Sequence, residues 1–400
     1  MAAPTAAFFV VLGFVQALWP LTMDLYLPAF PAIEQELRTT PQFVSLTLTG
    51  AFVGMAVGQL TAGSLSDRVG RMRPLLAVLA VYAVATVGCA LSPSVDILIA
   101  CRVVQGVGSA ASSVIVLAIV RDCAAGPRMV LLLARLQLVN GTFVVTAPAL
   151  GAMLLQVMSW RGLFWILVAF GGALLVTVAA TVGRRETLPP ERRRPPALQE
   201  LIGDYRTLFG DREYLVPLAA NTLLWAGMMG YMASSSFIFQ DVFGLEEGKY
   251  AVVFGGHGAV MILAAQLSAR LTNRYGLRPV IAFGACGAGI SALALIVGVL
   301  VWPDALGAFL VPLFGFTASF GVLSPCLQAG ALQHHGGRAG TAASLLGAAT
   351  MIAGAVAAPI VASFGVESVR PAAYFLAACA LGAVAVVVVG RQGGRVASVR

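Results

Sequence analysis

The chain consists mainly of long apolar runs separated by short polar segments. Twelve runs reach the roughly 20 residues that a helix needs to cross a hydrocarbon core of about 30 Å. They are predicted at residues 8–28, 44–65, 75–92, 97–120, 130–157, 162–183, 214–240, 249–271, 279–302, 305–331, 338–363 and 370–390. Because a backbone in lipid must satisfy its polar groups internally, each run is expected to form an α-helix. The first run has no small-residue cleavage site, so we expect a retained helix and not a signal peptide.

The composition points to the same solvent. Hydrophobic residues make up 59% of the 400 residues, charged residues make up 10%, and the mean hydropathy is +0.90. So few polar residues could not cover the surface of a water-soluble domain of this length. The sequence therefore predicts an all-α integral membrane protein with twelve transmembrane helices.

The pattern of charge divides these helices into two sets of six. Residues 184–213 carry 13 of the 42 charged residues and cannot lie in hydrocarbon, so we interpret them as a cytoplasmic linker. An N-terminal six-helix bundle (1–183) and a C-terminal six-helix bundle (214–400) would flank it. The segment SDRVGRMRP (66–74) resembles TNRYGLRP (272–279) in the corresponding loop, which indicates duplicated, pseudo-symmetric bundles suited to alternating access.

Within the linker, six apolar residues fall at helical spacing. They allow either an amphipathic helix on the cytoplasmic surface or a loosely ordered loop. These residues are Leu198, Leu201, Ile202, Tyr205, Leu208 and Phe209.

The formal charge of +8 comes from 24 arginines and one lysine, Lys249, which occur in short clusters between the apolar runs. If the N-terminus is cytoplasmic, 19 basic residues fall in inside segments and only 4 in outside segments. This partition follows the positive-inside rule and predicts that both termini are cytoplasmic. It also argues against a nucleic acid partner. The six cysteines are scattered without a CxxC pair, so we expect neither a metal site nor a disulfide framework.

The loop GSLSDRVGRMRPL (63–75) combines small and charged residues at regular spacing. Gly63 and Gly70 permit a tight turn, while Asp67, Arg68 and Arg71 are expected to form a charged latch that one bundle arrangement stabilises and another releases. Plain positive-inside topology is the alternative, although it explains the arginines and not the spacing of the glycines and the aspartate.

Asp24 is the one acidic residue of 17 that falls well within an apolar run. An ionised carboxylate at membrane depth costs at least ~2.5 kcal/mol, so Asp24 is expected to be neutral unless it is paired. A carboxyl group that gains and loses a proton is the minimum part of a proton-coupled transporter. The alternative is an acid near the outer helix end, since only about 6 Å of helical rise separate Asp24 from Pro28.

Arg102 is the other isolated charge, at the start of the fourth predicted helix. If that helix begins outside, Arg102 lies at the depth of Asp24, and the two residues are predicted to pair. A purely topological arginine is the alternative.

Small residues at helical spacing also predict close helix contacts. These are Gly54, Gly58, Gly106 and Ala110.

The seventh predicted helix carries the polar and aromatic residues that suit a cavity for varied apolar ligands. Asn221, Trp225 and Tyr231 are the candidates there. His257 is a candidate proton relay. The pair His334 and His335 is interpreted as interfacial.

Three segments resemble motifs of the major facilitator superfamily. The loop 63–75 resembles its signature GxLaDrxGrkxxl, and RVVQGVGSA (102–110) resembles its fourth-helix motif RxxQGxgaA. NGTFVVTAPALGA (140–152) is similar to its fifth-helix antiporter motif, in which a GP is followed by GG. Here Pro148 follows an alanine and Gly151 precedes one, so the match is partial.

Five further segments resemble the Bcr/CflA group of drug:proton antiporters within that superfamily. They are MDLYLPAFP (23–31), LAIVRD (117–122), LFWIL (163–167), ETLPPERR (186–193) and GTAASLLG (340–347). Within these and the preceding motifs, Tyr26 and Gln105 become further cavity candidates.

The resemblance implies a monomer in a bacterial inner membrane that exports small amphipathic drugs, such as phenicols or bicyclomycin, in exchange for protons. A proton-coupled or facilitated transporter of a small metabolite is the alternative. No nucleophile with a base, metal-ligand cluster or phosphate-binding loop appears in the sequence, so neither an enzyme nor a cofactor is expected.

Overall fold

The computed structural model describes residues 6–123, 126–182, 186–189, 191, 193, 198–333, 339–365 and 368–397. These residues contain twelve helical segments long and apolar enough to cross a membrane, which confirms the predicted number. The segments are Phe8–Leu37, Pro41–Val69, Met72–Ala90, Val95–Cys123, Leu138–Leu155, Trp160–Thr181, Arg212–Val242, Gly248–Tyr275, Leu277–Val301, Leu306–Leu332, Thr341–Ser363 and Arg370–Gly390. No strand occurs within these described ranges.

The chain folds as two compact units, Met1–Pro196 and Ala197–Arg400. The N-terminal unit holds the first six spans. Its elements are α1 (Ala6–Gln16), α2 (Leu18–Asp24), the 3₁₀ turn η1 (Leu27–Ala29), α3 (Phe30–Leu37), α4 (Pro41–Val69), α5 (Met72–Ala90), α6 (Val95–Cys123), α7 (Gly126–Leu155), α8 (Trp160–Thr177) and the π turn η2 (Val178–Val182).

The C-terminal unit holds the last six spans. Its elements are α9 (Leu198–Gly210), α10 (Arg212–Phe237), the π turn η4 (Ile238–Val242), α11 (Glu247–Tyr275), α12 (Leu277–Val301), α13 (Leu306–Leu332), α14 (Ala339–Ser363) and α15 (Arg370–Ala397). α9 is the segment for which the sequence allowed a helix or a loop, and the helix is confirmed. It packs against α10 and α14.

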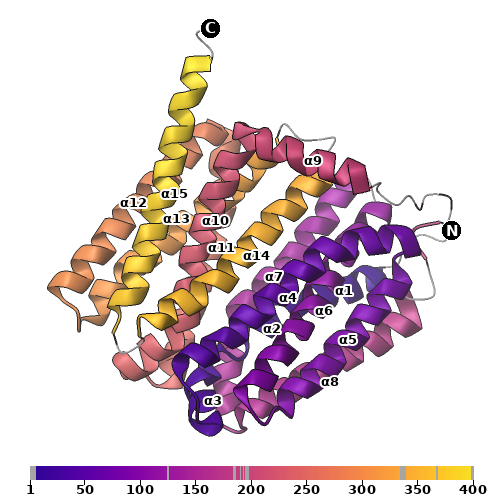
Figure 1. The fold of residues 1–400 in the computed structure, drawn as a ribbon, viewed down its shortest axis with the longest axis horizontal. Helices are drawn as coiled ribbons and strands as arrows, with labels where there is room; N and C mark the ends of the chain where they lie inside the picture. The colour runs from indigo at the N-terminus through magenta and orange to yellow at the C-terminus, as the bar shows by residue number, and fades with distance from the viewer. Residues whose placement is uncertain are drawn as a thin grey trace. The chain divides into compact units, whose positions relative to one another are not determined.

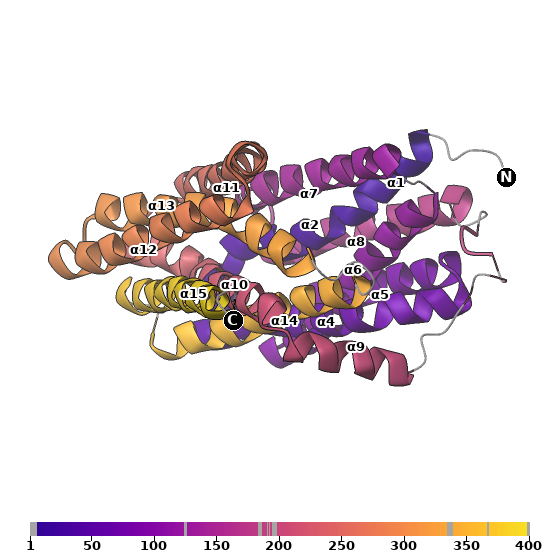
Figure 2. The same cartoon turned by 90° about the horizontal axis from the view of Figure 1, so that it is seen from above.

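The two units repeat the same internal packing. In the N-terminal unit, α4 and α5 both pack against α6, α5 also contacts α8, and α2 contacts α7. The corresponding pairs of the C-terminal unit are α11 and α12 with α13, α12 with α15, and α10 with α14 (Figures 1 and 2). Each unit is therefore a bundle in which the second, third and fourth spans form one packed group.

The duplicated loops also share their backbone conformation. Gly70 ends α4 with φ 104° and donates its N–H to the carbonyl of Ser66. Gly276 ends α11 with φ 84° and donates to Thr272 in the same way. Both lie in a region of backbone space that is nearly exclusive to glycine, which explains why glycine occupies the same place in both copies.

The first span is broken, and the predicted end near Pro28 is wrong. The helix is interrupted after Asp24, turns through η1, and continues in α3 to Leu37. Proline lacks a backbone N–H, but it is tolerated in the first turn of a helix, where that donor has no intrahelical partner. Pro28 in η1 and Pro31 in α3 both occupy such positions.

α4 and α6 approach each other with their backbones in contact, as the spacing of small residues predicted. A Cβ atom added at Gly54 would overlap the carbonyl oxygen of Val103, and one added at Gly106 would overlap that of Ala51. Only glycine permits this separation, because any side chain would overlap the facing backbone. In lipid no hydrophobic driving force acts between helices, and they associate by such close van der Waals packing.

Candidate functional site

Arg102 lies near the start of α6 and is fully buried, with 0% of its surface exposed. Its Nη1 donates to the carbonyl oxygen of Thr22 at 2.9 Å and to Oε1 of Gln105 at 2.7 Å. The guanidinium carbon is 4.2 Å from the centre of the Tyr26 ring, a cation–π contact. The Tyr26 hydroxyl is itself 3.0 Å from Oγ1 of Thr47 on α4. Sequence reasoning named three of these residues, and the structure brings those three together.

The polar contacts continue from Gln105 into α5. Nε2 of Gln105 donates to Oγ1 of Thr86 at 2.9 Å, and Thr86 donates to the carbonyl of Tyr82 at 2.6 Å. The Tyr82 hydroxyl is 2.9 Å from Oγ1 of Thr22 on α2. This network links α2, α5 and α6 inside an apolar core, where each satisfied polar group avoids a large desolvation penalty. Threonine and tyrosine in apolar runs gave no sequence signal for it, beyond their being the few hydroxyls there.

Asp24 ends α2 and is 3% exposed, and it is the single acidic residue among the buried polar residues that the structure describes. It is followed by 13 residues of the same span, about 20 Å of helical rise. The depth of Asp24 in the membrane stays a prediction, as does the alternative of an acid near an outer helix end, because Asp24 is also the last residue of α2.

The predicted ion pair between Asp24 and Arg102 does not form. Neither residue takes part in any of the four ion pairs found among the described residues. Arg102 instead contacts Thr22 and Tyr26, two residues before and two residues after Asp24. The partners of Arg102 on this span are thus a backbone carbonyl and an aromatic ring, and not the Asp24 carboxylate.

A second cluster lies where α4 and α6 end and α5 begins. Arg71, whose side chain is 8% exposed, binds Oδ1 of Asp67 at 2.6 Å and Oδ2 of Asp122 at 2.8 Å. It also donates to Oγ of Ser66 at 2.7 Å. The predicted latch thus has a carboxylate from α6 that the loop alone did not reveal. Arg68 is exposed and forms no ion pair within the described residues.

Glu186 completes this cluster and was missed. Its Oε1 accepts the backbone N–H of Arg71 at 2.8 Å, and its Oε2 accepts that of Met72 at 3.3 Å. The carboxylate therefore caps the first turn of α5, where free N–H groups and the helix dipole favour a negative charge. Partial burial opposes the charge, but these N–H groups, that of Leu188 and the nearby Arg193 hold the pKa of Glu186 below its ordinary value.

The partial antiporter motif lies on α7, beside the break in the first span. A Cβ added at Gly151 would overlap the carbonyl oxygen of Leu25 and lie 3.0 Å from its carbonyl carbon. Pro148 lies inside α7, three residues earlier. The prediction that Gly63 permits a tight turn is wrong, because Gly63 lies inside α4, where an added Cβ would be 3.9 Å from Val114. Of these two glycines, Gly151 is therefore the one whose backbone lies directly against the residue that follows Asp24.

The candidates on α10 take part in separate contacts. Oδ1 of Asn221 accepts from Ser324 of α13 at 2.8 Å. Trp225 packs edge-on against Phe320 with 5.1 Å between ring centroids. Among the residues that the structure describes, the indole N–H of Trp225 and the hydroxyl of Tyr231 are buried and have no hydrogen-bond partner. They are therefore polar groups that a bound molecule could satisfy.

His257 is buried on α11 and contacts two other helices. Oγ1 of Thr317 lies 2.9 Å from Nδ1 and 3.1 Å from Nε2 of the ring, and the Met228 sulfur is 3.4 Å from Nε2. Its ring centroid is 5.1 Å from that of Tyr231. The pair at 334 and 335 lies outside the described residues. Within the described part of the chain no three His, Cys, Asp or Glu side chains gather as a metal site would require.

Two similarly packed six-span bundles, with buried polar networks at depth, define a polytopic α-helical membrane transporter. The family model of the Major Facilitator Superfamily matches residues 12–358, and the chain belongs to this family. The resemblance inferred from the loop and helix motifs is therefore confirmed. Members of this family are transporters and not enzymes, and they act on small molecules.

Relatives with similar sequences cover most of the chain. It is 28% identical to the MFS-type transporter YdgK of Bacillus subtilis (strain 168), over 88% of this chain and 87% of that protein. It is 27% identical to a bicyclomycin resistance protein homolog of Haemophilus influenzae, over 94% of each. It is 29% identical to the multidrug resistance protein MdtL of Shewanella sp. (strain ANA-3), over 85% and 84%. Twelve apolar helices and bacterial relatives together indicate a multi-pass inner-membrane protein.

Solved structures share the fold at low sequence identity. A D-xylose-proton symporter matches with a TM-score of 0.74 and 14% identity, covering 96% of this chain and 97% of that one. The human organic anion transporter MFSD10 (TETRAN) matches with a TM-score of 0.69 and 18% identity, covering 95% and 98%. These likenesses establish the architecture and no more.

Proposed function

We propose that this transporter exports small amphipathic molecules, with phenicols and bicyclomycin as candidate drugs, in exchange for protons. The observation that carries the proposal is the burial of Asp24, the one acidic residue so enclosed in the described chain. Relatives named for bicyclomycin resistance and multidrug resistance support the direction and the type of cargo.

The proposed coupling separates the buried cation from the buried acid. Thr22 and Tyr26 hold Arg102 in the polar network, whereas Asp24 forms no ion pair within the described residues. Burial without a cationic partner favours the neutral carboxyl, and opening to water favours the charged one. If cargo binds the charged form and the proton competes for it, proton uptake drives release of the cargo.

One titrating carboxyl is energetically sufficient. A proton moving down ~100 mV supplies about 2.3 kcal/mol, and one pH unit supplies about 1.36 kcal/mol. Since each 1.4 kcal/mol is a factor of ten, a one-for-one exchange of a neutral molecule would hold roughly a 500-fold gradient.

The cluster of Asp67, Arg71, Asp122 and Glu186 is proposed as the cytoplasmic latch. It joins the ends of three spans through charged groups, so a change in their spacing breaks several interactions together. This placement assumes cytoplasmic termini, which the distribution of arginine favours.

The orientation has a direct test in Lys249, the single lysine of the chain. It is exposed at the start of α11. A membrane-impermeant amine reagent added to intact cells whose outer membrane is permeabilised should label Lys249. Labelling of Lys249 only in inverted vesicles would show that the topology is the opposite of the one proposed.

The coupling is tested with Asp24→Asn, and Asp96→Asn is the matched control because Asp96 is exposed at the start of α6. Cells expressing each protein are screened for drug susceptibility across a compound panel, and proton movement on drug addition is followed in inverted vesicles. We expect the control to behave as wild type and Asp24→Asn to lose resistance and drug-driven proton movement. Full resistance with intact coupling in Asp24→Asn contradicts the proposal.

A transporter of a small metabolite is the second candidate, and the fold shared with a D-xylose-proton symporter is compatible with it. Transport driven by a proton gradient in inverted vesicles distinguishes the two. Export predicts that a proton gradient, acid inside, drives accumulation of cargo in these vesicles, whereas symport predicts its loss.

A further inference from the structure

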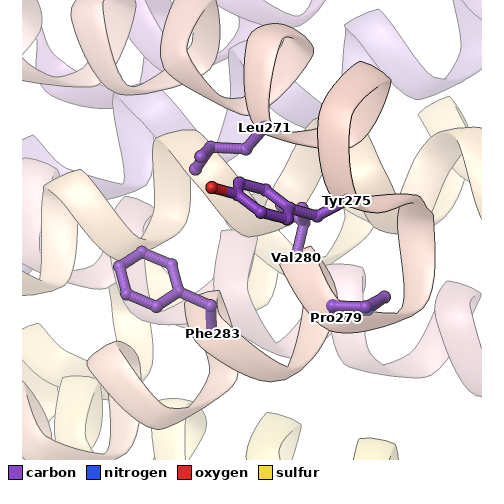
Figure 3. A pocket seen from close by; sticks show the side chains of 5 residues that line it. All are labelled: Leu271, Tyr275, Pro279, Val280 and Phe283. Atoms are coloured by element: carbon purple, nitrogen blue, oxygen red, sulfur yellow. The ribbon is translucent and has the colours of Figure 1, made fainter.

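An apolar groove lies on the outer surface of the C-terminal unit, at the turn between α11 and α12. It has a volume of about 320 Å³ and is lined by Leu271, Tyr275, Pro279, Val280 and Phe283. Figure 3 shows these side chains around one space, with residues of α11 on one side and residues of α12 on the other. Tyr275 is 57% exposed and Phe283 is 65% exposed, so the groove opens outward.

Two exposed arginines adjoin the lining residues of this groove along α11. Arg270 and Arg274 are exposed and precede the lining residues Leu271 and Tyr275 on α11. Because they are four residues apart, they share a helix face. The Arg274 guanidinium lies 5.4 Å from the centre of the Tyr275 ring, at the edge of the groove.

These cations have no carboxylate partner in the described chain. In the duplicated loop of the N-terminal unit, Asp67 pairs with Arg71. The residue at the position of Asp67 is Asn273. Leu277 occupies the position of Arg71, and Arg274 occupies that of Arg68, which also forms no ion pair within the described residues. The repeat therefore keeps the turn without either member of the Asp67–Arg71 pair, and the charges of Arg270 and Arg274 are available to an external anion.

We propose that this groove binds an anionic phospholipid, with an acyl chain along the apolar lining and the phosphate on Arg270 and Arg274. The lining carries a single side-chain polar atom, the Tyr275 hydroxyl, so hydrocarbon is the chemistry it accepts. Guanidinium groups match phosphate oxygens in geometry and charge. With cytoplasmic termini, as proposed above, this turn faces the leaflet that carries anionic lipid.

Native mass spectrometry of the purified full-length protein tests the site. The protein in detergent is titrated with phosphatidylglycerol, with phosphatidylcholine of the same chains, and with glycerol 3-phosphate as a headgroup without chains. Arg270→Gln/Arg274→Gln removes the anion contacts, and Leu271→Trp fills the groove while leaving the charges. Arg206→Gln/Arg212→Gln is the charge-matched control, since both arginines lie near α9, which packs on α10 and α14.

We expect tight binding of one phosphatidylglycerol, weakened about 30-fold by the loss of two basic residues. Leu271→Trp should also weaken it, and the control should not. Equal binding of phosphatidylcholine, equal binding of glycerol 3-phosphate, or wild-type binding by Leu271→Trp would each overturn the proposal. The selectivity of the wild-type protein decides the first two outcomes even if a variant misfolds, and none of the readouts requires transport.

Discussion

Replacement of Gly151 by alanine tests whether α7 must touch the broken first span. The added methyl group would overlap the Leu25 carbonyl oxygen and sit 3.0 Å from the carbonyl carbon. Both neighbours are backbone atoms, so no side chain can rotate out of the way. Relief requires that α7 and the segment after Asp24 move apart.

The size of this movement follows from ordinary contact distances. Carbon atoms pack at about 3.5–4.0 Å, and the carbonyl oxygen is nearer to the added methyl group than the carbonyl carbon is, so the two backbones must separate by more than about 1 Å at this point. Overpacking of a tight interior costs about 1–3 kcal/mol. A shift of about 1 Å in a functional group can lower a rate about 100-fold, and here the displaced group is the carboxyl proposed for coupling.

The assay compares Gly151→Ala with Gly172→Ala, a helical glycine of α8 that has nothing within 4 Å of an added Cβ. Both proteins are purified for thermal unfolding in detergent, and both are assayed for drug-driven proton movement in inverted vesicles. We expect Gly172→Ala to match wild type, and Gly151→Ala to unfold earlier and to transport at least tenfold more slowly. Wild-type stability and transport in Gly151→Ala would refute the packing argument.

Three other substitutions test the remaining contacts. Glu186→Gln should lower stability at neutral pH. Because the pKa of Glu186 is held below its ordinary value of 4.5, the stability that the carboxylate contributes is lost as the pH falls through the lowered pKa. In unfolding measurements over a series of pH values, the stability difference between Glu186→Gln and wild type should therefore narrow only below pH 4.5. Gly70→Ala should destabilise the protein more than Gly276→Ala. Alanine at either position would carry backbone strain of about 1–3 kcal/mol, but only alanine at position 70 would place a Cβ 2.5 Å from Glu186 Oε2. Equal losses of stability on thermal unfolding would exclude that contact. Arg102→Lys keeps the charge without the planar fork, so a folded protein with impaired transport in vesicles is expected, and normal transport would count against the network.

The number of spans could be predicted because the length of an apolar run is a local property of the chain. The break after Asp24 could not, because Pro28 is compatible with either the end of a helix or the first turn of another. The structure resolves this in favour of α3, which carries the span on to Leu37.

The candidate site was predicted in part for a similar reason. Arg102 and Gln105 lie on one face of α6, and their motif spacing shows it. The rotation of α2 is not visible in a motif, so the pairing of Arg102 with Asp24 was wrong. Glu186 lies 115 positions from Arg71, which it caps, and a contact at that separation exists only once α5 and the segment after α8 have folded together.

The glycine contacts between α4 and α6 bear on how the N-terminal unit can move. With backbone against backbone at Gly54 and Gly106, no layer of side chains can shear between the two helices. They should move as one rigid pair that carries Arg102 near the start of α6, and Asp67 and Asp122 at the opposite end of the pair. A displacement of Arg102 should then also displace Asp67 and Asp122, and the N-terminal unit should bend at the interrupted first span.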